Sequence, residues 1–265
     1  MSFNTPIRKI IKFMLRLINL PKINYHIRDL IKKTYSFTPW RFKSFLRTKH
    51  FYSSFIKKGD LCFDIGANRG QYTKIFLQLG ARVVSVEPQI ECLKMLYKLY
   101  SQNKLVKIVG KAVGSHEGVK EMIICNKHNS LSTLSEKWKN ESRHSIKFNE
   151  IRKQKVELIT LDKLIERFGL PQFCKIDVEG YELKVLKGLS KRIPILCFEF
   201  VKEFLLETQK CIERILSIGP AKFNFTVSYN SEFYFKKWVN ETQLFETLVS
   251  IDNHRLWGDI YIKYG

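Results

Sequence analysis

Residues 63–72 read FDIGANRGQY and join an apolar run to a run with helical periodicity. The apolar residues 61–65 predict a strand and residues 71–79 predict a helix, so the quoted stretch holds a strand end, a tight turn and a helix start. Glycines in such a turn let a ligand touch the backbone, and the first turn of a helix offers N–H groups without a partner in the helix. With Asp64 at the strand end, the stretch predicts a ligand-binding turn.

The glycine spacing of this turn fits a dinucleotide poorly. A dinucleotide fingerprint has glycine at the first, third and sixth places, but counted from Gly66 the later two places hold Asn68 and Gln71. The order Asp-x-Gly-x-x-x-Gly instead suits a nucleoside that carries an amino acid. The ammonium group of such a ligand favours the carboxylate, and its own carboxylate favours the N–H groups.

A second acid, Glu87, follows Asp64 by 23 residues, ends the next predicted strand and precedes Pro88. A carboxylate there can accept both ribose hydroxyls, and each charge-assisted bond is typically worth about 1.5 to 3 kcal/mol. Either acid alone could instead cap a helix or pair with a cation. Because both should lie at the carboxyl ends of neighbouring strands, together they predict a nucleoside site.

Short apolar runs alternate with amphipathic helical stretches from residue 60 onward, which is typical of βαβ units on a parallel sheet. The predicted strands are 61–65, 82–87, 105–109, 173–177 and 193–199, and the predicted helices are 71–79, 91–100, 182–189 and 208–218. Residues 119–160 interrupt this order with two β segments, 120–125 and 156–160, which suggests an insertion over a ligand crevice. Its cations could meet an anionic substrate or belong to a solvated loop: Lys127, Lys137, Lys139 and Arg143.

Three further stretches accompany the glycine turn: KAVG at 111–114, LD at 161–162 and KIDVEGYE at 175–182. In this order the sequence resembles the FkbM-type methyltransferases over residues 58–200. The resemblance implies a class I S-adenosylmethionine-dependent methyltransferase: an α/β, Rossmann-like fold with a mostly parallel seven-stranded sheet and helices on both faces. The last two strands would be 223–228 and 259–263. Such enzymes usually methylate hydroxyl groups of sugars, glycans, lipids or polyketide-like products.

The turn, the second acid and the resemblance together give the expected cofactor-binding residues. They are Asp64, Gly66, Ala67, Asn68, Gly70, Tyr72, Glu87, Pro88, Ala112 and Val113. The cofactor they imply is S-adenosylmethionine, and the match to the family is weakest at the last two strands.

Methyl transfer to a weakly acidic hydroxyl needs a base or a metal near the acceptor. The candidates are Asp177, Glu179 and Glu199, of which Asp177 and Glu199 should end adjacent strands at the ligand crevice. Asp177 is the first choice as base. Alternatively, Glu179 caps the following helix, and Glu182 pairs with Lys175 or Arg69. We assign no metal ligands, and whether a divalent metal assists is left open.

Residues 1–57 lie outside the resemblance and form a basic, mainly helical appendage to the methyltransferase domain expected at 58–265. The whole chain carries a formal charge of +21, and its first 58 residues hold a single acid. Apolar residues at 7–18 recur at helical spacing opposite four cations, which predicts a basic amphipathic helix. Such a helix docks on an anionic membrane beside a lipid-linked acceptor, or packs on the catalytic domain.

The composition favours a cytoplasmic enzyme, which the appendage could hold peripherally on the inner face of a membrane. The six cysteines show no metal-binding or disulfide pattern, so we expect buried thiols. No apolar run reaches the roughly 18 residues of a membrane span. Two alternatives stay open: an RNA methyltransferase whose basic N-terminal region follows phosphates, and a non-catalytic binding protein that has kept the fold.

Overall fold

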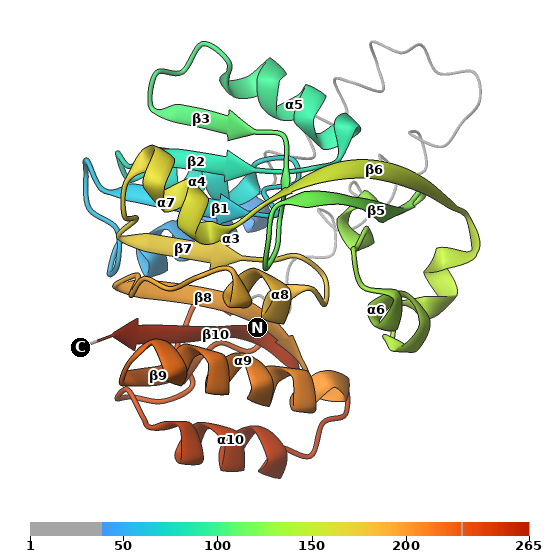
Figure 1. Ribbon diagram of the computed structural model, residues 1–265. Coiled ribbons are helices and arrows are strands. Elements are labelled where there is room, and N and C mark those ends of the chain that lie inside the picture. The colour runs from blue at the N-terminus through green and yellow to red at the C-terminus, as the bar shows by residue number, and fades with distance from the viewer. Residues whose placement is uncertain (1–38, 229, 265) are drawn as a thin grey trace, which may run out of the picture. The chain divides into compact units, whose positions relative to one another are not determined.

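The computed structural model describes residues 39–228 and 230–264 (Figure 1). The amphipathic helix predicted at 7–18 lies outside the described residues. The chain divides into two compact units, residues 1–48 and 49–265, and each strand of the described part belongs to the second unit. The domain boundary after residue 57 stays a prediction.

The predicted alternation of strands and helices is present, with bounds that differ by a few residues. The strands are β1 (Leu61–Ile65), β2 (Arg82–Val86), β3 (Val106–Val109), β4 (Ala112–Val113), β5 (Gly118–Cys125), β6 (Ile151–Ile159), β7 (Phe173–Ile176), β8 (Ile195–Val201), β9 (Ala221–Phe225) and β10 (Trp257–Tyr264). The α-helices are α3 (Pro39–Tyr52), α4 (Gln71–Gln78), α5 (Ile90–Tyr100), α6 (Glu136–Glu141), α7 (Leu161–Phe168), α8 (Glu182–Lys187), α9 (Leu205–Ile218) and α10 (Glu241–Ser250).

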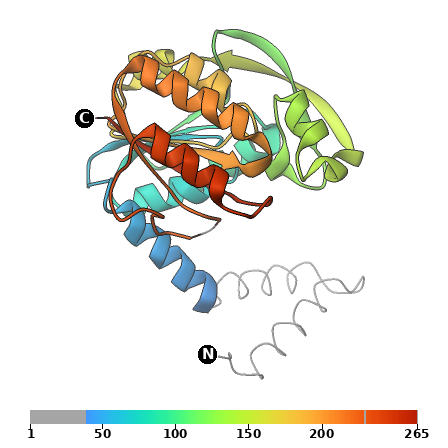
Figure 2. The same ribbon diagram turned by 90° about the horizontal axis from the view of Figure 1, so that it is seen from below.

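Seven strands form the main sheet in the order β3-β2-β1-β7-β8-β10-β9. β10 runs antiparallel to both of its neighbours, and the other pairs are parallel. Helices cover both faces, with α4 and α5 on one side and α7, α8 and α9 on the other (Figure 2). This is the class I methyltransferase architecture that the resemblance implies, so the predicted fold class is confirmed.

The central strands are apolar because they are buried on both faces. All five residues of β1 and all four of β7 are buried. One face packs on α7, α8 and α9 through aliphatic side chains, such as Ile176 and Val185. The other face carries aromatic rings: Phe173 lies 5.4 Å from Tyr52 and 5.5 Å from Phe76, measured between ring centroids.

A second, three-stranded sheet, β4-β6-β5, confirms the predicted insertion. With α6 it lies beyond the carboxyl ends of β1, β2 and β7, where ligands of open α/β sheets bind (Figure 1). The six cysteines are all buried and free, as expected. In the part of the chain that the structure describes, no helix combines the length and the apolar composition that crossing a bilayer requires.

Candidate active site

The turn after β1 is a series of left-handed backbone conformations. Gly66, Asn68 and Gly70 have φ angles of 81°, 48° and 76°. At Gly66 a Cβ atom would lie 1.8 Å from the backbone oxygen of Asp177, so only glycine lets the turn approach the end of β7 this closely. Asparagine is one of the few other residues that adopt this conformation readily. The predicted ligand-binding turn therefore also touches the segment that holds the predicted base.

Asp64 is buried at the end of β1, where it holds the start of α4. Its Oδ2 accepts hydrogen bonds from the Thr73 N–H at 2.9 Å and the Thr73 hydroxyl at 2.6 Å. The helix-capping alternative is thus what the structure shows for this oxygen. Burial raises the pKa of Asp64 to about 6. A cationic ligand group beside Asp64 would favour its charged form.

Glu87 follows β2, and its side chain is hydrogen-bonded to the turn after β1. Its Oε2 accepts the Asn68 N–H at 2.7 Å, and its Oε1 accepts the Gln89 N–H at 2.9 Å. The residue is only 2% exposed, and burial raises its pKa to about 7. Each carboxylate oxygen has a second lone pair, so the same group can still accept ribose hydroxyls.

One observation tests whether this region fits S-adenosylmethionine. Gln89 donates a side-chain N–H to the Asn129 carbonyl at 3.0 Å, while its Oε1 is buried and has no hydrogen-bond partner among the described residues. A buried acceptor two residues after Glu87 needs a donor, and a ribose hydroxyl would supply one. The residues present therefore fit the cofactor.

The other predicted cofactor residues lie around the same turn. Tyr72 is half-buried, with the Lys175 Nζ 4.6 Å from its ring centroid. The Pro88 carbonyl accepts the Gln154 side-chain amide at 2.7 Å. Ala112 and Val113 form the buried strand β4. Their contacts with a cofactor stay predictions.

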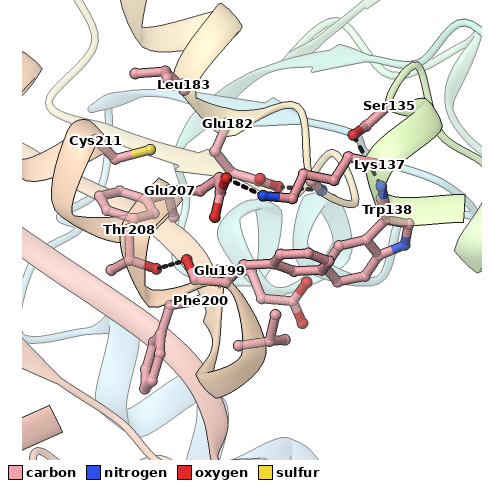
Figure 3. A pocket seen from close by; sticks show the side chains of 14 residues that line it. Ser135, Lys137, Trp138, Glu182, Leu183, Glu199, Phe200, Glu207, Thr208 and Cys211 are labelled. Carbon is pink, nitrogen blue, oxygen red and sulfur yellow. Dashed lines mark hydrogen bonds and ion pairs between the residues drawn. The ribbon is translucent and has the colours of Figure 1, made fainter. Parts of the chain in front are cut away.

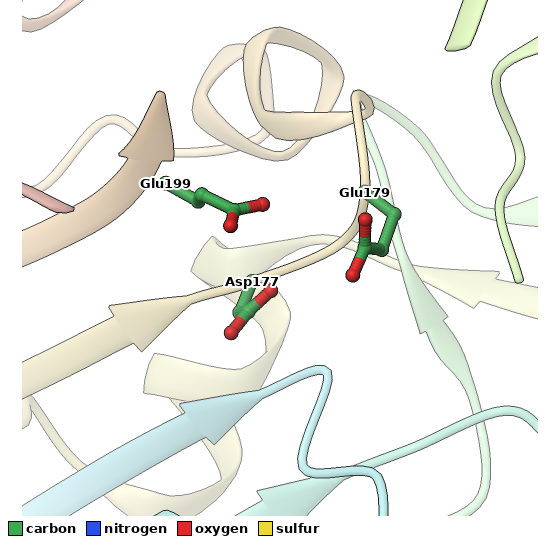
Figure 4. A group of neighbouring side chains, drawn as sticks. All are labelled: Asp177, Glu179 and Glu199. Carbon is green, nitrogen blue, oxygen red and sulfur yellow. The ribbon is translucent and has the colours of Figure 1, made fainter. Parts of the chain in front are cut away.

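The three candidate catalytic acids converge, as Figure 4 shows. One carboxylate oxygen from each of Asp177, Glu179 and Glu199 lies within 4.8 Å of the others. Glu199 does not end a strand, contrary to the prediction, because β8 continues to Val201 and pairs with β10. It lies one residue past Phe198, the last partner of β7, and so still reaches the level at which β7 ends.

Glu179 and Glu199 are half-buried and lie among several like charges. Burial, followed by the neighbouring carboxylates, raises the pKa of each well above its usual range. Asp177 differs because its Oδ2 lies 3.3 Å from the Nζ of Lys175. Of the three acids, Asp177 is therefore the one in contact with a cation.

The structure shows neither of the two structural alternatives to a catalytic role, which were a helix cap by Glu179 and an ion pair of Glu182. Glu182, not Glu179, holds the turn before α8, since its Oε1 accepts the N–H groups of Val178 and Gly180 at 3.2 Å each. Glu182 pairs with neither Lys175 nor Arg69. Lys175 instead contacts Asp177 and Asp259. Three converging carboxylates are also a ligand set that a divalent cation accepts, so the same residues could hold one.

A small cavity of about 70 Å³ adjoins Glu199 (Figure 3). Its wall is mostly apolar and comes from α6, the start of α8, β8 and α9, including Trp138, Phe200 and Phe204. The indole N–H of Trp138 is buried and finds no hydrogen-bond acceptor in the described part of the chain. Sequence reasoning missed these residues, since only the folded insertion brings α6 beside α9.

The insertion cations do not form an open anion-binding patch. Lys137 bonds Glu207 at 2.5 Å, and Arg143 pairs with Glu203. Lys127 and Lys139 pair with glutamates as well. The first two pairs link the insertion to the segment after β8.

The chain was compared with curated proteins, with solved structures and with protein families. No curated protein matches the chain. Among solved structures it is similar to precorrin-6y C5,15-methyltransferase from Geobacter metallireducens, with 10% identity, a TM-score of 0.44, and coverage of 82% of this chain and 88% of that chain. An rRNA methylase from Streptococcus thermophilus shows 8% identity, a TM-score of 0.42 and coverage of 82% and 93%. Aeropyrum pernix fibrillarin with bound S-adenosyl-L-methionine shows 10% identity, a TM-score of 0.37 and coverage of 78% and 67%.

The family comparison is decisive, because the methyltransferase FkbM domain matches residues 64–217, more than half of the chain. These residues run from Asp64, at the glycine-rich turn, through the three converging acids and α9. The chain therefore belongs to the FkbM methyltransferase family and is an S-adenosylmethionine-dependent methyltransferase.

Proposed function

We propose that the enzyme transfers the methyl group to a hydroxyl of a sugar, glycan, lipid-linked or other small-molecule acceptor. The observation that carries the proposal is the contact between the two halves of the site. The cofactor turn meets the acid cluster where Gly66 lies against the backbone of Asp177. A methyl donor in the turn would thus lie beside three carboxyl groups that could orient and deprotonate a hydroxyl.

The division of charge within the cluster supports Asp177 as the base. Glu179 and Glu199 have raised pKa values and so favour their protonated forms, in which a carboxyl group donates a hydrogen bond. Asp177 contacts the ammonium group of Lys175 and has an exposed edge, with 32% of its side chain accessible. In the proposed reaction, Asp177 accepts the hydroxyl proton while the acceptor oxygen attacks the methyl carbon in line with the departing sulfur.

Peripheral contact with an anionic membrane through residues 7–18 belongs to the same proposal. Four cations opposite an apolar face would hold the enzyme beside a lipid-linked acceptor, at about 1 kcal/mol for each basic residue near the surface. The paired cations of the insertion favour this acceptor class over RNA. Lys137 and Arg143 are bound to glutamates and so are poorly placed to follow a phosphate backbone.

The test compares cells that make the protein with cells that make its Asp177→Asn variant. Mass spectrometry of the lipid, polysaccharide and RNA fractions would look for a product heavier by one CH₂ group. The expected product lies in the lipid or polysaccharide fraction and depends on Asp177. A methylated product confined to RNA would contradict the proposal. Loss of activity with a chelator would add a divalent cation to the mechanism.

A further inference from the structure

A buried lysine lies where the cofactor turn, the acid cluster and the last long strand meet. Lys175 is 1% exposed in β7, and its Nζ lies 3.0 Å from Asp259 Oδ1 and 3.3 Å from Asp177 Oδ2. We propose that Lys175, held by Asp259, is a positioning residue that fixes the Asp177 carboxylate toward the acceptor. The proposal rests on the proposed function, in which Asp177 takes the hydroxyl proton.

Strand register explains why this ammonium group points at acids. Lys175 pairs with Asp64 of β1 on one side and with Cys197 of β8 on the other, so these side chains share one face of the sheet. Two residues further on, the same face carries Asp177 after β7 and Glu199 in β8. Asp259 belongs to this face too, because it lies opposite Glu199 in the antiparallel pair of β8 and β10.

Without the lysine, the charged groups described at this end of the face would all be acids. Asp177, Glu179, Glu199 and Asp259 lie within one small region, and Lys175 is the cation that contacts two of them. Like charges at such distances repel, and the side chain of Asp177, which is 32% exposed against 16% for Asp259, could turn away into solvent. The ammonium group thus sets the direction in which Asp177 points.

The alternative is that Lys175 serves stability only, but a buried ion pair is a poor device for that purpose. Removing ions from water is costly, and well-packed apolar residues of similar size are often as stable or more stable. The neighbours of Lys175 on its face are suited to apolar packing, since they include the ring of Tyr72 and the buried Phe173. The contact with Asp177 therefore explains the buried ammonium group of Lys175 better than stability does.

The contact with Tyr72 extends the same network to the cofactor. Tyr72 lies in the first turn of α4, and its ring centroid is 4.6 Å from the Lys175 Nζ. One ammonium group therefore contacts the helix that begins at the cofactor turn, the predicted base, and β10. A change at position 175 should alter the alignment of donor and base more than it alters the affinity for the donor.

The decisive variant is Lys175→Met/Asp259→Leu, which removes both buried charges and keeps the packing volume. The probes are S-adenosylmethionine for calorimetry, and S-adenosylmethionine with a labelled methyl group plus lipid and polysaccharide extract for the transfer rate. We expect a cofactor Kd within about 3-fold of wild type, unfolding at least as resistant to urea, and a transfer rate lower by about 100-fold, the typical effect of misplacing a reacting group. A crystal structure of the variant should show the Asp177 carboxylate turned away.

Two single variants separate positioning from structure. Asp259→Asn keeps the Lys175 and Asp177 contact, so it should lower stability while the transfer rate falls by less than about 5-fold. Lys202→Met removes another partly buried lysine, whose Nζ is bound by three carbonyl groups at the end of α10, and should leave the rate unchanged.

A wild-type rate in the double variant would overturn the positioning role of Lys175. Absence of transfer by the wild-type enzyme, despite cofactor binding, would instead overturn the proposed acceptor class. The two failures are therefore distinguishable.

Discussion

Replacing Glu87 with Gln tests the cofactor site at a carboxylate that is fixed by two backbone hydrogen bonds. Both carboxylate oxygens of Glu87 accept backbone N–H groups, from Asn68 at 2.7 Å and from Gln89 at 2.9 Å. A glutamine keeps one acceptor oxygen and places an NH₂ group against the other N–H. The variant therefore loses one charge-assisted bond and the negative charge that a ribose hydroxyl would meet.

The loss of the charge-assisted bond from a ribose hydroxyl to Glu87 amounts to roughly 1.5 to 3 kcal/mol, which raises the Kd for S-adenosylmethionine about 10- to 100-fold. Isothermal titration calorimetry at pH 8 measures this directly. The matched control is Glu91→Gln, the same change in the first turn of α5, where the glutamate is exposed and pairs with Arg152. The control should bind the cofactor within about 2-fold of wild type, since exposed ion pairs contribute little.

The pH dependence of binding adds an independent check. Burial raises the pKa of Glu87 to about 7, so the wild-type carboxyl group is mostly protonated at pH 6 and mostly ionised at pH 8. The affinity for S-adenosylmethionine should therefore fall as the pH falls through 7, and this dependence should weaken in Glu87→Gln. Unchanged affinity in a folded Glu87→Gln variant would exclude Glu87 from the ribose site, and a wild-type affinity that is flat from pH 6 to 8 would contradict its raised pKa.

Three further predictions concern catalysis, stability and location. Asp177→Asn should lower the single-turnover transfer rate about 10²- to 10⁴-fold, with little change in cofactor affinity; an unaffected rate would move the base to a neighbouring glutamate. Because Asp64 and Glu87 have pKa values raised to about 6 and 7, these two groups bind more protons in the folded apo protein than in the unfolded chain between about pH 4 and 7. Their contribution to the free energy of unfolding thus falls as the pH rises through this window, and urea unfolding should show a smaller fall between pH 5 and 8 in Glu87→Gln; an equal fall would contradict this assignment. Deleting residues 1–20 should abolish flotation with anionic liposomes, whereas equal binding of both forms would exclude this helix as the anchor.

The ligand turn could be predicted from sequence because its determinants are local. Glycines at 66 and 70 and an acid at the end of an apolar run specify a strand, a turn and a helix within ten residues. The role of Asp64 was harder to foresee, because it caps α4 through Thr73, nine residues further along the chain. That spacing is far longer than a local capping motif, in which the cap lies within three residues of the amide that it accepts.

The sequence predicts which acids form the cluster, but it does not predict the ion pairs and hydrogen bonds around them. Asp177 and Glu179 follow one predicted strand, so their proximity is a local property. The place of Glu199 depends on where β8 stops, and β8 continues because β10 pairs with it. Lys175 contacts Asp259 across 84 residues of sequence, and no periodicity within either strand sets that register.

The antiparallel direction of β10 explains how the end of the chain reaches the active site. Parallel strands present their carboxyl ends to the crevice, so a strand that runs the opposite way presents its beginning there. Asp259 is the third residue of β10 and therefore lies beside Glu199, at the level of the acid cluster. It also lies outside residues 64–217, which match the FkbM domain, whereas Lys175 and Asp177 lie inside them. The base and its lysine thus belong to the matched part of the chain, while the carboxylate that holds the lysine is supplied by the C-terminal strand. Changes in this strand can therefore alter the orientation of the base without changing any residue that the acceptor or the cofactor touches.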